Sequence, residues 1–162
     1  MPKGVFGGIF LKNRVRYPWL LPLLIILTLC FIWGNSLLPA TVSAGFSGWV
    51  RRLLNSLFGL AGGSGALIGG DGILRKIAHS AEFACLGAEL VFWRERRRTL
   101  RLRDLFLWGL MVALADETIQ LFVAGRAGLV QDIWIDLAGY AAGCGLSLLF
   151  LGLRAGKCVP ER

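Results

Sequence analysis

Acidic residues, histidine and paired cysteines are scarce in this chain of 162 residues. Ten Asp and Glu stand against 18 Lys and Arg, and there is a single His. The cysteines Cys30, Cys85, Cys144 and Cys158 are isolated from one another, without CxxC or Cys/His ligand spacing, so we interpret them as small apolar residues. No HExxH or GK[ST] motif occurs, which leaves neither a zinc-protease signature nor a phosphate-binding P-loop.

Apolar residues dominate instead. They make up 56% of the chain, and the mean hydropathy of +0.64 lies outside the usual range of soluble proteins. We therefore expect an all-α, polytopic integral membrane protein that forms one compact unit over residues 1–162. The apolar runs predict four transmembrane helices, at about 18–34, 74–93, 105–123 and 133–153.

The positive charges cluster at three places along the chain. Four lie before the first apolar run, six lie in the loop 94–104 and three lie at the C-terminus, together thirteen of the 18. The positive-inside rule then places both termini and the arginine loop in the cytoplasm, in a multi-pass protein of the bacterial cytoplasmic membrane. The alternatives are a nucleic-acid or anionic-lipid patch for the loop, and a cleaved signal peptide ending near Ser43-Ala44 for the first run.

The connection after the first span contains one apolar, partly periodic segment, residues 46–60. Its apolar residues recur at helical spacing, while Arg51 and Arg52 point in other directions. An amphipathic helix in the first external loop fits this pattern, either lying on the membrane or packing onto the spans. The glycine-rich stretch that follows, residues 59–72, is predicted to be a linker or a mobile lid.

Ionisable residues inside apolar segments are costly in a membrane and indicate a site or an ion-pair network. Three of them follow one another at steps of three in the second span, and two pairs in the later spans are four residues apart, which places each group on one helical face. A Gly-Arg turn joins the last two spans. With the predicted topology, all of these residues converge in the extracytoplasmic half of the membrane: Lys76, His79, Glu82, Asp116, Glu117, Gln120, Arg126, Asp132 and Asp136.

The charges of this polar cluster do not balance. Its five carboxylates face three cations, counting Arg75 with Lys76 and Arg126. A partly desolvated cluster of this kind should keep a carboxylate protonated, charge its histidine or hold a cation, so we expect coupled titration near neutral pH. An isolated histidine in an apolar helix is more commonly a satisfied core residue, but its neighbours Lys76 and Glu82 favour a functional role for His79.

Three motifs make the sequence resemble the VanZ-like family of bacterial membrane proteins. They are NSLLP, RKIAHSAEF, and DETIQLFVAGRAGLVQDIWIDLAG, which are spread over residues 33–143. Phe83 stands where the family often has Tyr. The resemblance implies an envelope protein of the kind that gives low-level resistance to teicoplanin, a lipoglycopeptide, and it points to the same polar residues as the charge argument.

Four functions stay open at this point. The first is binding or shielding of a membrane lipid, a lipidated envelope precursor or the antibiotic, and the second is an intramembrane enzyme acting on a lipid headgroup. The third is a proton-coupled transporter, and the fourth is a purely structural ion-pair network. The sequence predicts no cofactor and no nucleic-acid partner, assigns no metal ligands, and allows a homo-oligomer. A metal-dependent form of the enzyme is conceivable, because His79 and several carboxylates could bind a divalent ion, but no HExxH-type motif supports it. The candidate catalytic residues are His79, Glu82, Glu117 and Asp132.

Overall fold

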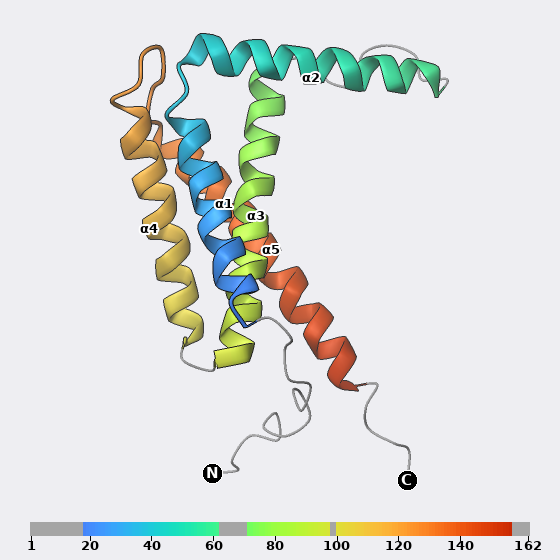
Figure 1. Ribbon diagram of the computed structural model, residues 1–162, viewed down its shortest axis with the longest axis vertical. Helices are drawn as coiled ribbons and strands as arrows, with labels where there is room; N and C mark the ends of the chain where they lie inside the picture. Colours follow the sequence, from blue (N-terminus) through green and yellow to red (C-terminus); the bar gives the residue numbers. More distant parts are fainter. Residues whose placement is uncertain (1–17, 62–70, 98–99, 157–162) are drawn as a thin grey trace.

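The computed structural model describes residues 18–61, 71–97 and 100–156, which contain five α-helices and no strand. The helices are α1 (Leu20–Ser36), α2 (Ala40–Leu60), α3 (Asp71–Arg97), α4 (Leu102–Gln120) and α5 (Val130–Gly156). Helices α1, α3, α4 and α5 form a bundle, and α2 lies across one end of it (Figure 1). The basic N-terminal residues, most of the predicted glycine-rich linker, and Lys157 and Arg162 lie outside the described residues.

The all-α prediction is confirmed, and each apolar run predicted to span the membrane falls on one helix of the bundle. The main difference is at the end of the third run, where α4 stops at Gln120 rather than near residue 123. The chain then turns through residues 121–129, where Gly125 has a φ of 73°, a conformation that glycine adopts without steric cost. This turn reverses the chain so that α5 can begin at Val130.

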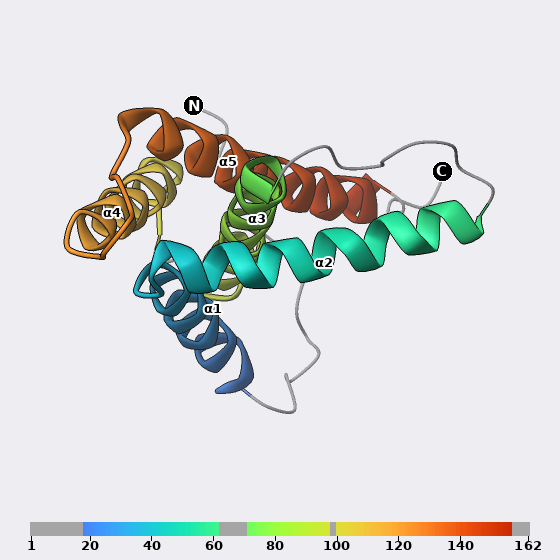
Figure 2. The ribbon, with the colours of Figure 1, turned by 90° about the horizontal axis from the view of Figure 1, so that it is seen from above.

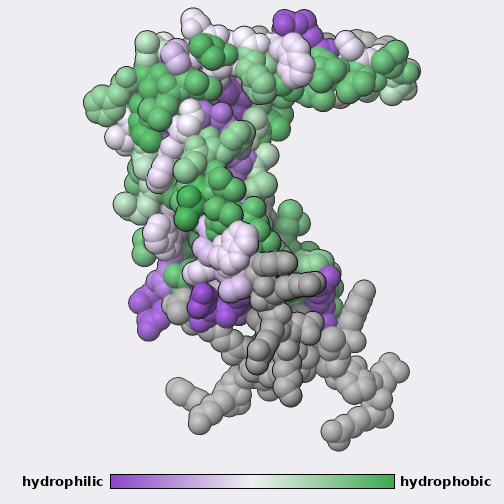
Figure 3. Space-filling model, viewed as in Figure 1, coloured by the Kyte–Doolittle hydropathy of each residue, from purple (hydrophilic) through white to green (hydrophobic). Residues whose placement is uncertain are grey.

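Among the described helices, one is by itself long and apolar enough to cross a membrane, and it covers Val130–Arg154. Helices α1 and α2 meet the same criterion only when taken together, and they are bent by 110° at the break between them. The charged and polar side chains that α3 and α4 carry lower their hydropathy. Large apolar side chains nevertheless face outward around the bundle, including Phe31, Met111 and Leu149. Figure 3 shows that much of the visible surface of the bundle is hydrophobic.

Helix α2 is longer than the predicted amphipathic segment, since it begins at Ala40 instead of residue 46. Its first half packs on the bundle and buries Ser47 and Gly48, while the second half extends beyond α3 (Figure 2). The apolar side chains of Leu53, Leu57 and Leu60 are exposed there. The helix therefore combines packing onto the bundle with an unpartnered apolar arm.

The closest contact in the bundle joins α3 and α5, which run in the same direction (Figure 1). Gly139 lies against Ser80, and Gly143 lies against the backbone of Ala84, so closely that a Cβ atom at either glycine would collide with it. The small residues predicted to allow close helix approach therefore do so. Beside this contact lies the apolar core, which includes Ile32 of α1, Phe83 and Leu86 of α3, and Val112 of α4.

We expect Gly143→Ala to destabilise the bundle, because the added methyl group meets the carbonyl of Ala84. Overpacking of this kind typically costs about 1–3 kcal/mol, measurable as a lower melting temperature of the detergent-purified protein. Gly145→Ala is the matched control, since no atom lies within 4 Å of its added Cβ. Equal melting temperatures for the two variants would contradict the close contact between α3 and α5.

Candidate functional site

The polar stripe of α3 lies beside the first two turns of α5. Because the two helices are parallel, residues that follow one another on α3 meet residues in the same order on α5. Lys76 Nζ lies 2.6 Å from Asp132 Oδ1, and three residues further along α3 the imidazole of His79 faces Asp136. The polar residues that share one face of α3 therefore meet the polar residues that share one face of α5.

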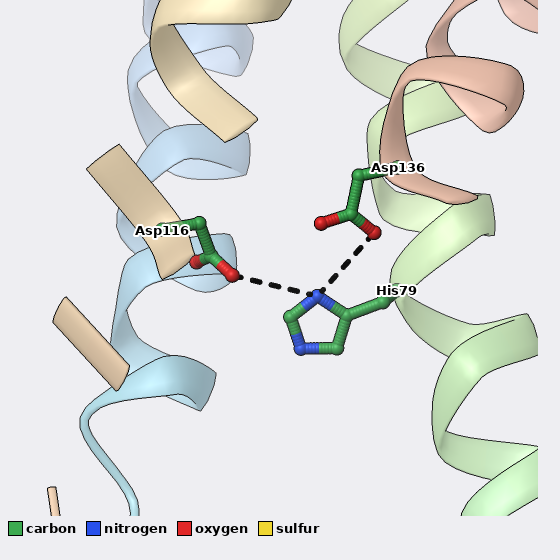
Figure 4. Close-up of side chains that lie close together, drawn as sticks. All are labelled: His79, Asp116 and Asp136. Atoms are coloured by element: carbon green, nitrogen blue, oxygen red, sulfur yellow. Dashed lines mark ion pairs between the residues drawn. The ribbon is translucent and has the colours of Figure 1, made fainter. Parts of the chain in front are cut away.

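His79 lies between two buried carboxylates (Figure 4). Its Nδ1 is 3.8 Å from Asp116 Oδ2 and 4.0 Å from Asp136 Oδ1, both too long for hydrogen bonds. The side chains of Asp116 and Asp136 are 0% and 3% exposed, and each retains one oxygen, Asp116 Oδ1 and Asp136 Oδ2, that has no hydrogen-bond partner in the part of the chain that the structure describes. Two buried carboxylates and one imidazole thus surround a common point.

The last turn of α4 is held by a network centred on Gln120. Its Nε2 donates to Asp116 Oδ2 at 2.9 Å, and it also lies 3.3 Å from Glu117 Oε1 and from Ser36 Oγ of α1. Glu117 Oε2 in turn accepts a hydrogen bond from the backbone N–H of Leu129. Gln120 therefore fixes the orientation of Asp116, and Glu117 fastens the turn that leads into α5.

Arg126 binds backbone carbonyls rather than the carboxylates of the polar cluster. Its Nε donates to Leu38 O at 3.1 Å and its Nη2 donates to Asn35 O at 2.9 Å, so it caps the C-terminal end of α1. Its Nη1 is buried without a hydrogen-bond partner among the described residues. Burial and the neighbouring positive charge of Arg75 lower the pKa of Arg126. Two like charges near one unsatisfied donor favour an anion at this point.

Two residues that the site analysis of the sequence did not single out take part in these contacts. Asn35 Nδ2 donates to Glu82 Oε1 at 2.9 Å, and Ser36 Oγ accepts from Gln120. Both lie in the NSLLP motif, and this motif is the sequence feature that could have identified them. Phe83 is completely buried in the apolar core.

Two hollows meet at His79. The smaller, of about 20 Å³, is polar and is bounded by residues of α3, α4 and α5. That volume is enough for one water molecule or ion. The larger is a groove of about 920 Å³ between α1, α2 and α3, mainly apolar, with Arg75, Glu82 and Arg126 among its polar residues. Arg75 and His79 line both hollows.

Comparison with known proteins identifies the family of the chain. The family model described as VanZ/LLP1 matches residues 19–151, which include α1 to α4, most of α5 and the whole polar cluster. Neither a curated protein nor a solved structure matches the chain. Because the match covers most of the sequence, this chain belongs to the VanZ/LLP1 family.

Proposed function

We propose that this protein binds an anionic lipid or lipidated ligand from the outer leaflet of the bacterial cytoplasmic membrane and thereby contributes to teicoplanin-type lipoglycopeptide resistance. The groove between α1, α2 and α3 carries the proposal. Most of its lining is apolar, and it is bounded by Leu24, Leu27 and Phe31 of α1, by Phe46 of α2 and by Ala81 of α3. Such a groove suits an acyl chain.

The polar residues of the groove suit an anionic headgroup. Arg75 and Arg126 both line it, and Nη1 of Arg126 has no protein partner among the described residues. A guanidinium binds phosphate or carboxylate with charge-assisted hydrogen bonds, which are about twice as strong as neutral ones. An amphiphile would therefore place its chain against α1 and α2 and its headgroup beside the arginines.

The proposed topology has four spans, α1, α3, α4 and α5, with both termini in the cytoplasm. One end of the bundle holds the start of α1, the end of α3, the start of α4 and the end of α5 (Figure 1). The described arginines of the loop between α3 and α4 and Arg154 gather at that end, as the positive-inside rule requires for the cytoplasmic side. The groove, α2 and the Arg126 turn then lie toward the outside.

An enzyme acting on the same headgroup is the second candidate. The observation in its favour is the position of His79 between Asp116 and Asp136 (Figure 4), because a carboxylate beside an imidazole orients it for general acid or base catalysis. A proton-coupled transporter would use the same three groups. We prefer binding, because a bound lipid alone accounts for the size and the mainly apolar lining of the groove.

The topology predicts different labelling of two engineered cysteines. In a variant without native cysteines, Ser56→Cys on α2 should react with a membrane-impermeant maleimide on intact protoplasts. Arg103→Cys, at the start of α4 with a side chain 70% exposed, should react only after permeabilisation. The opposite labelling pattern would show that the topology is the reverse of the proposed one, with the groove in the cytoplasmic leaflet.

Removing Arg75, one of the two arginines that line the groove, should weaken binding of the proposed ligand. We expect Arg75→Gln to reduce the occupancy of co-purifying lipid about tenfold, the loss expected for a hydrogen bond to a charged group. Native mass spectrometry of the protein in mild detergent measures this occupancy. Arg103→Gln is the control, because it removes a cation at the other end of the bundle. Equal lipid occupancy in both variants would contradict a headgroup site at Arg75.

Blocking the groove should remove resistance. Expression of the wild type in a teicoplanin-susceptible bacterium should raise the minimum inhibitory concentration several-fold, and Ala81→Trp should return it to the basal value because the indole fills the groove. Ala141→Trp, on the exposed side of α5, should retain resistance. His79→Gln should weaken resistance only in part, whereas complete loss with normal lipid occupancy would favour the enzyme over the binder.

A further inference from the structure

We propose that His79, Asp116 and Asp136 form a binding site for one divalent transition-metal ion, with Zn²⁺ as the preferred occupant. The sequence assigned no metal ligands, because these residues come from three different helices and share no ligand motif. In the fold they meet. One ligand atom from each lies within 4.8 Å of the others.

The distances suit a shared ion better than a shared proton. His79 Nδ1 lies 3.8 and 4.0 Å from the two carboxylates, whereas a hydrogen bond would bring each pair to about 3 Å. Ligands about 2.0–2.2 Å from a tetrahedral zinc ion lie about 3.3–3.6 Å apart. Small rotations of the three side chains would close that difference around an ion.

The carboxylates also lack the partners that burial requires. Asp136 Oδ2 and Asp116 Oδ1 accept no hydrogen bond from any described residue, although both side chains are almost completely buried. Lys76 binds Asp132, and the described hydrogen bonds of Arg126 go to carbonyls of the α1 end. With a neutral imidazole the three groups carry two negative charges, which one divalent cation neutralises.

The chemistry of the donor set points to zinc. One imidazole nitrogen and two carboxylate oxygens are ligands that Zn²⁺ accepts, and sites with three protein ligands keep a position for water or substrate. The polar hollow of about 20 Å³ beside His79 and Asp136 provides space for that fourth ligand. Gln120 Nε2, 2.9 Å from Asp116 Oδ2, supplies the outer hydrogen bond that orients a ligating carboxylate.

Zinc binding to the full-length protein tests this inference without any lipid. The protein is purified in mild detergent without a metal-binding tag, its cysteines are alkylated, and chelator is dialysed away. Titration with ZnCl₂, followed by calorimetry and elemental analysis, should give one ion per chain. Asp136→Asn should raise Kd at least about 100-fold, and Gln120→Ala about tenfold, as expected for a residue that orients a ligand.

A control variant and a second measurement test whether zinc binds at this site rather than at other groups of the chain. Glu89→Gln removes a carboxylate of the same helix as His79, one that binds Thr28 away from the cluster, and should leave Kd unchanged. Because His79 is the only histidine of the chain, Zn²⁺ should protect the wild type from modification by diethylpyrocarbonate. This measurement needs no variant to fold.

The inference would be overturned by any of three results: no zinc bound to the wild type, equal affinity in Asp136→Asn, or a modification rate of His79 that Zn²⁺ leaves unchanged. Equal affinity in Asp136→Asn would assign the ion to other groups of the chain. None of these results depends on the lipid proposal, because that proposal rests on Arg75 and the apolar groove.

Discussion

Backbone contact between α3 and α5 determines where the ionisable groups lie. Gly139 follows Asp136 by three residues and touches Ser80, the neighbour of His79. The distance between the imidazole of His79 and the carboxylate of Asp136 therefore depends on the absence of a side chain at residue 139. A larger residue there would push the helices apart and leave His79 and both aspartates buried without one another, which is costly in an apolar bundle. The packing of small residues and the electrostatics of the cluster thus depend on one contact.

The polar cluster has two electrostatically different sides that meet at His79. Toward α4 and α5 lie the oxygens of Asp116 and Asp136 that have no hydrogen-bond partner among the described residues, and these oxygens attract cations. Toward the groove lie Arg75 and Arg126, which attract anions. A metal ion and an anionic headgroup would therefore occupy different sides without competing. Their charges would attract each other across the imidazole, so that each ligand would favour binding of the other.

Long apolar runs predicted the helices of the bundle, and spacing along a helix indicated which polar side chains share a face. The three-residue spacing of Lys76 and His79 placed both on one face of α3, and the four-residue spacing of Asp132 and Asp136 placed both on one face of α5. Spacing contains no information on partners from other helices, and for that reason the carbonyl contacts of Arg126 and the pairing of Asn35 with Glu82 were missed. The 110° bend between α1 and α2 also depends on tertiary packing, which the apolar pattern of α2 left open between two alternatives.

Arg126 links the end of α1 to the turn between α4 and α5. Two of its nitrogens hold the carbonyls of Asn35 and Leu38, and Asn35 also donates to Glu82 at the groove. An anion bound at the remaining Nη1 would satisfy this buried donor and hold the guanidinium in the position from which it also binds the two carbonyls of α1. Since α1 forms one wall of the groove, binding of the proposed headgroup would stabilise the wall against which the proposed acyl chain would pack. The two proposed subsites would then be coupled through the side chain of Arg126.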